Sequence, residues 1–496
     1  MNCSSGAVAA VVAALTCSVM ASDLQAQDTS AVAPAVVCSS KVGERQTCAA
    51  DTQTGVTLLR STGAVPCALG TTWGFDQQSI WVSDGCSGEF SLGLKKKKTW
   101  GTYTPTLGFK VANTDHGTLS IKLITYLRYL NELGLDPSFV DAFGITQPVD
   151  RRQDIQLQKL LIQFLGWALS PKFNYFLWVW SANTNMGLGA QVVLGGNLQY
   201  TIDRHLTVGG GIRGLPGVRS TEGNWPNWLG VDNRLIADEF FRPSYTTGVW
   251  ILGNIVDRLS YTAMLGNNLS QLGVDAGQLD IGLNTVSVAV TWLPTTGEFG
   301  FMGQFGDFDY HKKAATRLAG RFTTSKENYQ SQPDNDNFEN VQIRLSNGGI
   351  IFAPNLFGPG IRVQDALYQM ADVDMGVEYH GFSLEGEYYW RWVSQFTGPN
   401  TAGLPNLFDH GFQLQASAMA IPRTLQIYVS GSKIFGEYGN PSDFRIGANW
   451  YPFKNQVLRW NAEFLHLNRS PVGGLSLPYP VGGNGPVFYT SLLLNL

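Results

Sequence analysis

The chain has 496 residues, of which 44% are hydrophobic and only 15% are charged, and its formal net charge is −4. Soluble domains average about 25% charged residues, so this deficit indicates a protein with much of its surface in lipid. The small negative charge argues against nucleic-acid binding. No apolar run after residue 30 is long enough for a spanning helix, so a membrane-spanning form of this chain must be a closed β-barrel.

The N-terminus is typical of an export signal. Residues 7–15 form an apolar core, and Leu24-Gln25-Ala26 is a plausible cleavage site. We therefore predict a signal peptide over residues 1–26. A lipid anchor on Cys17 is the alternative.

A small Cys-rich module is predicted next, over residues 27–94. Four cysteines lie close together in it, and none occurs later in the chain. In a short exported segment this pattern predicts two disulfides, although the sequence does not choose among the three pairings. A zinc site is the weaker alternative, because the spacing contains no Cys-x-x-Cys. The predicted disulfide residues are Cys38, Cys48, Cys67 and Cys86.

The module resembles an uncharacterised Cys- and Trp-rich module of exported bacterial proteins. Besides the cysteines, the matching features are Trp73-Gly74-Phe75 and Ile80-Trp81-Val82. Trp73 and Trp81 are candidates for stacking on sugars, but packing in the core is the favoured interpretation. The alternative function is therefore cell-wall or glycan binding through residues 38–94, with the barrel serving only as the membrane anchor. We expect the module to lie in the periplasm. A basic linker, residues 95–99, follows it.

From residue 100 to residue 496 the sequence predicts only strands and loops. At roughly 25 residues per strand and connection, this length predicts about 16 strands, whereas the strand-like stretches give a raw count of 18. Those stretches lie near residues 119–129, 155–165, 173–182, 187–200, 205–213, 245–254, 258–266, 283–293, 298–310, 314–325 and 340–346, before seven C-terminal strands.

The seven C-terminal strands alternate apolar residues with polar or charged ones. Within residues 443–450, Phe444 and Trp450 share one face of a strand, and Arg445 and Asn449 share the other. A soluble β-sandwich would bury the apolar face. Small residues within the apolar faces and aromatic residues at strand ends favour the inverse, with apolar side chains in lipid. We therefore predict an all-β fold, a transmembrane antiparallel β-barrel of about 16 strands with a small disulfide-stapled N-terminal β module.

Charged residues on the inward faces are the predicted pore-lining residues. Their mixture predicts a field across the lumen that passes both ion signs, rather than a strongly selective ring. The alternative is that these charges pair with one another and contribute nothing to transport. The early, basic set is Lys122, Arg128, Arg213, Arg317, Arg321 and Arg344, and the later, mostly acidic set is Asp374, Glu378, Glu385, Glu387, Arg391, Arg445, Arg459 and Glu463.

Residues 214–244 are the best candidate for a loop that folds into the lumen. The segment combines aromatic residues that could anchor it with the predicted constriction residues Arg234, Asp238 and Glu239. A loop outside the barrel that packs against a neighbouring subunit is the alternative.

Residues 204–267 resemble the phosphate-selective porin O and P family. The likeness lies in the Gly-rich strand RHLTVGGGIR, the following EFFR and the stretch DRLSYTAMLGN, and it extends more loosely over residues 100–496. The resemblance implies a homotrimeric outer-membrane porin of 16 strands with an inward-folded loop and a preference for anions such as phosphate. The chain departs from the family at Leu496, where an aromatic residue is usual, and it lacks a Lys-Pro-Phe-Gly-like segment after Arg213.

No catalytic or metal-binding motif stands out. The chain contains no Gly-x-Ser-x-Gly, no His-Glu-x-x-His and no Gly-x-x-x-x-Gly-Lys, and its six histidines are scattered. We expect no enzyme, no catalytic residue, no cofactor and no metal. The predicted function is a Gram-negative outer-membrane porin, surrounded by lipid, whose water-filled channel passes small hydrophilic solutes or ions.

Overall fold

A computed structural model describes residues 35–50, 52, 56–63, 65–76, 78–92, 102–182, 191–222, 225–270, 282–300, 303–330, 343–474 and 477–496. The predicted signal peptide and basic linker lie outside these residues. The chain divides into two compact units, Met1–Lys98 and Thr99–Leu496. Among the described residues, no helix has both the length and the apolar character needed to cross a membrane.

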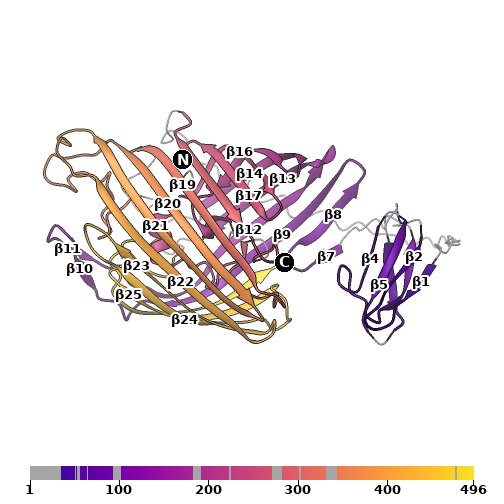
Figure 1. Cartoon of the computed structure of the whole chain (residues 1–496). Coiled ribbons are helices and arrows are strands. Elements are labelled where there is room, and N and C mark those ends of the chain that lie inside the picture. The colour runs from indigo at the N-terminus through magenta and orange to yellow at the C-terminus, as the bar shows by residue number, and fades with distance from the viewer. Residues whose placement is uncertain are drawn as a thin grey trace, which may run out of the picture. The chain divides into compact units, whose positions relative to one another are not determined.

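The N-terminal unit contains two three-stranded antiparallel sheets, in the orders β1-β6-β3 and β2-β5-β4 (Figure 1). The predicted pair of disulfides is confirmed, and the pairing is Cys38–Cys48 and Cys67–Cys86. The first disulfide links β1 to β2 and so joins the two sheets. The strands are β1 (Ala35–Ser39), β2 (Arg45–Ala49), β3 (Val56–Ser61), β4 (Trp73–Phe75), β5 (Ser79–Ser83) and β6 (Ser87–Leu92).

The tryptophans of this unit have different surroundings. Trp73 is only 4% exposed and packs in the core against Phe90, with ring centroids 4.8 Å apart. Trp81 is half-buried, and the Arg45 guanidinium lies over its ring at 4.0 Å. Because Trp73 is part of the core, it has no open face for a sugar ring.

Sixteen strands of the second unit, β9 and β12–β26, form a closed antiparallel barrel (Figure 1). Each pairs with its neighbour in sequence, and β26 closes the barrel onto β9. These strands are β9 (Gly117–Asn131), β12 (Gln153–Ala168), β13 (Ser170–Ala182), β14 (Gln191–Asp203), β15 (Leu206–Gly214), β16 (Tyr245–Val256), β17 (Leu259–Gly266), β18 (Thr285–Trp292), β19 (Ala315–Asn328), β20 (Asp365–Tyr379), β21 (Phe382–Thr397), β22 (Leu407–Ile421), β23 (Leu425–Phe435), β24 (Ser442–Trp450), β25 (Leu458–Asn468) and β26 (Gly485–Asn495).

Four short strands accompany the barrel. They are β7 (Thr102–Thr104) and β8 (Gly108–Thr114), which extend the pairing of β9, and the hairpin of β10 (Ser138–Val140) and β11 (Thr146–Pro148). Two short helices, α1 (Arg219–Glu222) and α2 (Ile236–Phe241), lie in the connection between β15 and β16.

The two ends of the barrel differ in the length of their connections. At one end most strands are joined by short turns, such as His380–Gly381, whose φ angles of 51° and 85° are typical of a type I′ turn. At the other end most connections are long. The first half of β9 and the C-terminal end of β26 lie towards the short-turn end, where Leu123 and Leu496 exchange backbone hydrogen bonds.

The predicted orientation of the C-terminal strands is confirmed. Phe444 is 55% and Trp450 45% exposed on the outer surface, whereas Arg445 between them is 2% exposed. The charged residues predicted to point inward from these strands are all buried, whereas most of the large apolar residues of the opposite faces are exposed. A barrel with apolar side chains outside and polar ones inside is the architecture of a transmembrane β-barrel.

Two predicted strands are wrong, and their removal reduces the raw count of 18 to 16. Residues 298–310 contain turns in their described part, because Gly300, Gly303 and Gly306 have φ values of 55°, 74° and 85° that break an extended strand. Residues 343–346, the described part of the predicted strand 340–346, form only an isolated bridge between Arg344 and Ile350. Both segments fold inward instead of joining the wall.

Candidate functional site

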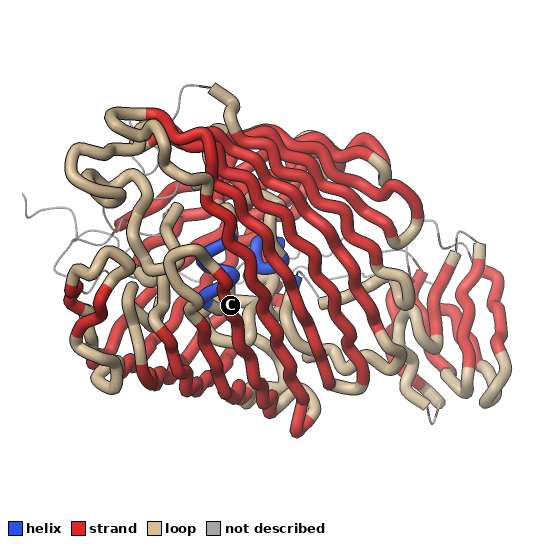
Figure 2. Tube along the Cα trace, turned by 60° about the vertical axis from the view of Figure 1, so that its left-hand side comes forward, coloured by secondary structure: helices blue, strands red, loops and turns tan. Residues whose placement is uncertain are grey.

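Residues 215–222 and 225–244, which we call the inner loop, fold into the barrel. Figure 2 shows its two helices in blue among the barrel strands. Phe241 is fully buried and stacks on Tyr389 of β21 at 5.1 Å, and the Arg391 guanidinium covers the ring of Phe240 at 3.8 Å. The alternative position, outside the barrel against a neighbouring subunit, is therefore wrong.

Polar side chains of the wall satisfy the backbone of the inner loop. A buried loop needs such partners, because an unpaired buried backbone group is costly. The Ser432 hydroxyl accepts a hydrogen bond from the amide of Ala237 at 3.1 Å. Three wall side chains donate hydrogen bonds to loop carbonyls: Arg445 Nη2 to Arg234 at 2.7 Å, Arg459 Nη1 to Trp228 at 2.9 Å and Asn449 Nδ2 to Leu229 at 3.0 Å.

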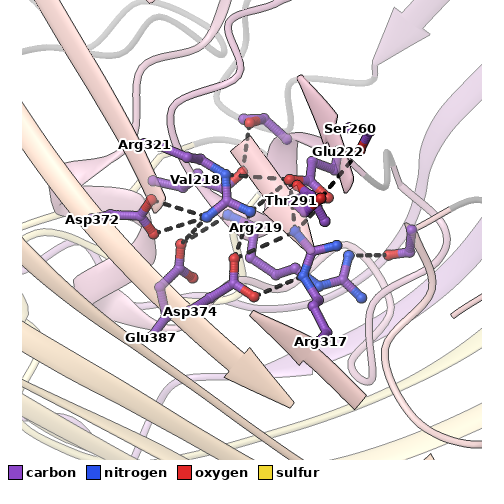
Figure 3. Close-up of polar contacts among 12 residues, drawn as sticks. Val218, Arg219, Glu222, Ser260, Thr291, Arg317, Arg321, Asp372, Asp374 and Glu387 are labelled. Carbon is purple, nitrogen blue, oxygen red and sulfur yellow. Dashed lines mark hydrogen bonds and ion pairs between the residues drawn. The ribbon is translucent and has the colours of Figure 1, made fainter. Parts of the chain in front are cut away.

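A cluster of ion pairs fixes α1 to the wall (Figure 3). The carboxylate of Glu222 lies 2.7 Å from Arg317 Nη2 and 2.6 Å from Arg321 Nη2. Asp374 binds the same two guanidinium groups, at 2.7 Å and 2.6 Å, and Asp372 lies 2.9 Å from Arg321. Burial raises the pKa of Glu222, but Arg317 and Arg321 outweigh it and hold this pKa at about 2, so Glu222 stays charged.

Arg219 connects the inner loop to a second inward segment. This segment, residues 293–314, joins β18 to β19 at the short-turn end, and we call it the inner turn. Arg219 donates to the carbonyls of Gly303 and Gln304 at 2.9 Å and 2.8 Å. Its guanidinium also pairs with Glu385 at 3.2 Å, and its backbone amide donates to Glu387 at 2.8 Å.

Apart from Lys122 and Arg213, the predicted inward charges therefore have close partners on the wall, the inner loop or the inner turn, instead of facing one another across the lumen. Glu385 and Glu387 hold Arg219, and Glu378 accepts a hydrogen bond from the amide of Gly300 in the inner turn. Six further members of the predicted set have these partners: Arg391 with Asp409, Arg445 with Asp443, Glu463 with Asn233, Arg459 with the Trp228 carbonyl, Arg128 with Gln156 and Arg344 with the Gly348 carbonyl.

Two adjoining cavities remain between the inner loop and the wall of β9 and β12–β15. Their volumes are about 290 Å³ and 360 Å³. They follow one another along β12 and β13 from the long-connection end towards the short-turn end, and we call them together the passage. Both cavities are lined by Gln163, Phe176, Glu222 and Trp225.

Aromatic side chains form much of the passage wall. Phe176, Trp178 and Trp180 lie on the inward face of β13 and line the cavity nearer the long-connection end. Trp178 pairs across the strands with Gly195, where a Cβ atom would lie 2.2 Å from the indole ring. The absent side chain therefore lets the Trp178 ring lie against the wall.

The charged groups of the passage are not balanced. Lys159 pairs with Asp232 at 2.8 Å, and its ammonium lies 4.9 Å from the Trp180 ring. Glu222 pairs with Arg317 and Arg321, which it shares with carboxylates of the wall. By contrast, Lys122 and Arg213 line the passage without an ion pair to any residue that the structure describes. Lys122 and Arg213 are the members of the predicted pore-lining set that reach the passage.

The predicted constriction residues interact mainly within the inner loop. Arg234 lies over the Trp228 ring at 3.9 Å, lines the passage and pairs with Glu239 at 3.4 Å. Glu239 also pairs with Arg242 at 2.7 Å, and Asp238 accepts a hydrogen bond from Ser220 at 2.9 Å.

A wider hollow of about 1110 Å³ lies at the long-connection end. Its lining comes from three connections of that end, within residues 132–152, 344–356 and 473–481. Arg344, predicted to line the pore, contributes to this hollow.

Sequence reasoning missed several residues of the passage. Lys159 lies beyond a register shift in β12 between Leu157 and Lys159, so a strict alternation assigns it to the wrong face. Trp178 and Trp180 alternate with Leu177 and Val179, so both faces of β13 are apolar and show no contrast. The partners of Glu222 are far from it in sequence, and no local pattern could have identified them.

One group of side chains has the composition of a metal site. The ligand atoms of Asp307, His311 and Glu378 lie within 4.8 Å of one another. Asp307 already accepts hydrogen bonds from the backbone amides of His311 and Gly381. Its carboxylate is also hydrogen-bonded to Nδ1 of the His311 ring at 2.7 Å. These contacts account for the cluster as a cap that holds the inner turn against β20.

Comparison with known proteins gives a family match in the N-terminal part alone. The family model described as "Protein of unknown function (DUF3011)" matches residues 6–116. Comparison with curated proteins gives no match.

Among solved structures, the chain is similar to OmpT of Vibrio cholerae, with 9% identity and a TM-score of 0.48 over 77% of this chain and 99% of that one. It is also similar to the anion-selective porin from Comamonas acidovorans, with 9% identity and a TM-score of 0.46 over 77% and 100%. A third similar structure is the outer membrane channel DcaP of Acinetobacter baumannii, with 8% identity and a TM-score of 0.47 over 78% of this chain and 99% of that one. At these values the likeness adds nothing on function, and the barrel assignment depends on the strand pairing of this chain itself.

Proposed function

We propose that this protein is an outer-membrane porin through which small hydrophilic solutes diffuse passively, with a preference for anions. The observation that carries the proposal is the passage between the inner loop and the wall of a closed barrel with an apolar exterior. Barrels of this size enclose more space than their wall side chains fill, and inward loops then set the width of the opening.

The preference for anions is supported by the charges of the passage. Its carboxylates, Glu222 and Asp232, are each bound to a basic side chain. Lys122 and Arg213 line it without such a partner among the described residues. These two cations line the passage and attract anions, which favours anions over cations as solutes. Phosphate, the anion named by the family resemblance, is one candidate.

The test is the reversal potential of the purified full chain in a planar bilayer under a KCl gradient. We expect a conducting channel with chloride preferred over potassium. The double variant Lys122→Gln, Arg213→Gln should shift the reversal potential towards potassium. The matched control is Arg469→Gln, because Arg469 is an exposed cation that does not line the passage. No conductance, or no shift in the double variant, would contradict the proposal.

Location and assembly are part of the same proposal. Short turns face the periplasm in outer-membrane barrels. The chain enters β9 at the short-turn end, so we propose a periplasmic N-terminal module. The trimer implied by the family resemblance is testable by chemical cross-linking in detergent, where a monomeric product alone would contradict it. Cell-wall binding by the module is not favoured, since Trp73 lies in its core.

A further inference from the structure

We propose that the passage recognises aromatic carboxylates as its preferred solutes. This inference depends on the proposed porin function and names the solute class that the same passage favours. It is carried by three features that meet there: a row of aromatic rings, a buried indole N–H with no partner, and two unpaired cations.

The row of rings lies along β13. Phe176, Trp178 and Trp180 occupy alternate positions of one strand face, which are roughly 7 Å apart. Phe176 and Trp178 have centroids 5.5 Å apart and planes at 33°. Trp225 and Trp228 of the inner loop line the same cavity from the opposite side. A flat ring that enters the passage therefore meets aromatic side chains of both β13 and the inner loop, and such contacts favour aromatic over aliphatic solutes.

The indole N–H of Trp225 has no acceptor. Trp225 is 9% exposed, and its Nε1 is buried without a hydrogen-bond partner in the described structure. Buried polar groups in proteins are normally paired, because an unsatisfied donor costs free energy. Trp225 lines both cavities of the passage, and a turn of its ring would bring this N–H, which is buried beside the passage, to a carboxylate oxygen of a passing solute.

The two unpaired cations lie in different parts of the passage. Arg213 lines the cavity nearer the long-connection end, and Lys122 lines the cavity nearer the short-turn end. A carboxylate can therefore leave one cation for the other while its ring moves along β13. Each step replaces one weak contact with another, as conduction through a selective pore requires.

Two amide groups of the passage are already engaged and do not favour a sugar acid as the solute. A sugar ring needs hydrogen-bond partners for several hydroxyl groups. The Asn197 amide already donates to the Ile212 carbonyl at 3.2 Å, and its oxygen accepts from Gln199 at 3.2 Å. These two wall amides are thus engaged with each other and with the backbone.

The test compares how sodium benzoate, sodium glucuronate and sodium acetate reduce the KCl current of the full chain in a planar bilayer. We expect half-block by benzoate at a concentration about 10-fold lower than by either other salt, as ring contacts of 0.5–1.5 kcal/mol allow. Block by glucuronate equal to that by benzoate would overturn the inference in favour of saccharides. Equal block by acetate would show that the ring is not recognised. A chain without KCl current would overturn the porin function itself.

Two variants locate the recognition. Trp178→Leu should raise the half-blocking benzoate concentration by about 3- to 10-fold. Trp225→Phe keeps a ring but removes the N–H, and should raise it by about 2- to 10-fold, the effect of one hydrogen bond. Trp292→Leu is the matched control, because Trp292 is 48% exposed on the outer surface of β18. A similar change in the Trp292 variant, or none in the other two, would refute the assignment.

Discussion

The carboxylate of Glu222 lies 2.6 Å from the guanidinium of Arg321, and this contact joins the inner loop to β19 of the barrel wall (Figure 3). Arg321 is buried, whereas the Glu222 side chain is 25% exposed towards the passage. One carboxylate therefore both anchors the loop and lines the opening beside it.

We expect Glu222→Gln to loosen the inner loop. The substitution leaves two buried arginines with one carboxylate partner fewer, and hydrogen bonds to charged groups contribute about 1.5–3 kcal/mol. Single-channel recordings should show larger current fluctuations and a stronger preference for chloride, because a negative charge leaves the passage. Asp257→Asn, a change in an exposed turn, is the control. Recordings identical to those of the unchanged protein would contradict the role of Glu222.

Gly195→Ala should narrow the passage. A Cβ atom at residue 195 would lie 2.2 Å from the Trp178 ring, so the ring must move away from the wall. Overpacking of this kind also costs about 1–3 kcal/mol of stability. We expect a lower single-channel conductance. Gly210→Ala is the matched control, because the nearest atom to its Cβ would be 3.8 Å away. Equal conductance in the two variants would show that Trp178 does not border the open path.

The stability of the inner loop in its position inside the barrel should depend on pH through Asp238. Burial raises the pKa of Asp238 from 3.8 to about 7, although Arg234 opposes the rise. A raised pKa means that the stability contributed by the protonated form is complete below pH 3.8 and is lost as the pH rises through about 7. Current fluctuations should therefore increase between pH 6 and pH 8, roughly one unit either side of that pKa.

Asp238→Asn should abolish this dependence, because its side chain does not titrate and can still accept the hydrogen bond from Ser220. The Glu222 anchor should not contribute to the change, since its pKa of about 2 keeps it charged throughout this range. A pH dependence that persists in the Asp238 variant would assign the effect to another group.

Removal of the Cys38–Cys48 disulfide should destabilise the N-terminal unit alone. This disulfide joins β1 to β2, and loss of such a link typically costs about 2–4 kcal/mol. Limited proteolysis of the Cys38→Ser, Cys48→Ser variant should cut the module faster, whereas the channel conductance stays unchanged. A module that resists protease as before would show that its core is sufficient without this link.

The inner turn illustrates where a local pattern misleads. Residues 298–310 are one of the predicted strands that the structure does not contain. The signal against it was present as three glycines at intervals of three residues, Gly300, Gly303 and Gly306, whose positive φ values end an extended chain. Their effect was visible in the sequence, but the inward destination of the segment was not, because Arg219 lies more than 80 residues away.

The sequence by itself determined the wall of this protein. Side chains alternate across a strand, so the order of Phe444, Arg445 and Ile446 assigns each to lipid or lumen without knowledge of any neighbour. Only the tertiary structure decided which inward charges meet water. Arg321 and Arg213 both point inward, but the inner loop covers the first and leaves the second on the passage, because its position depends on contacts between residues far apart in the chain.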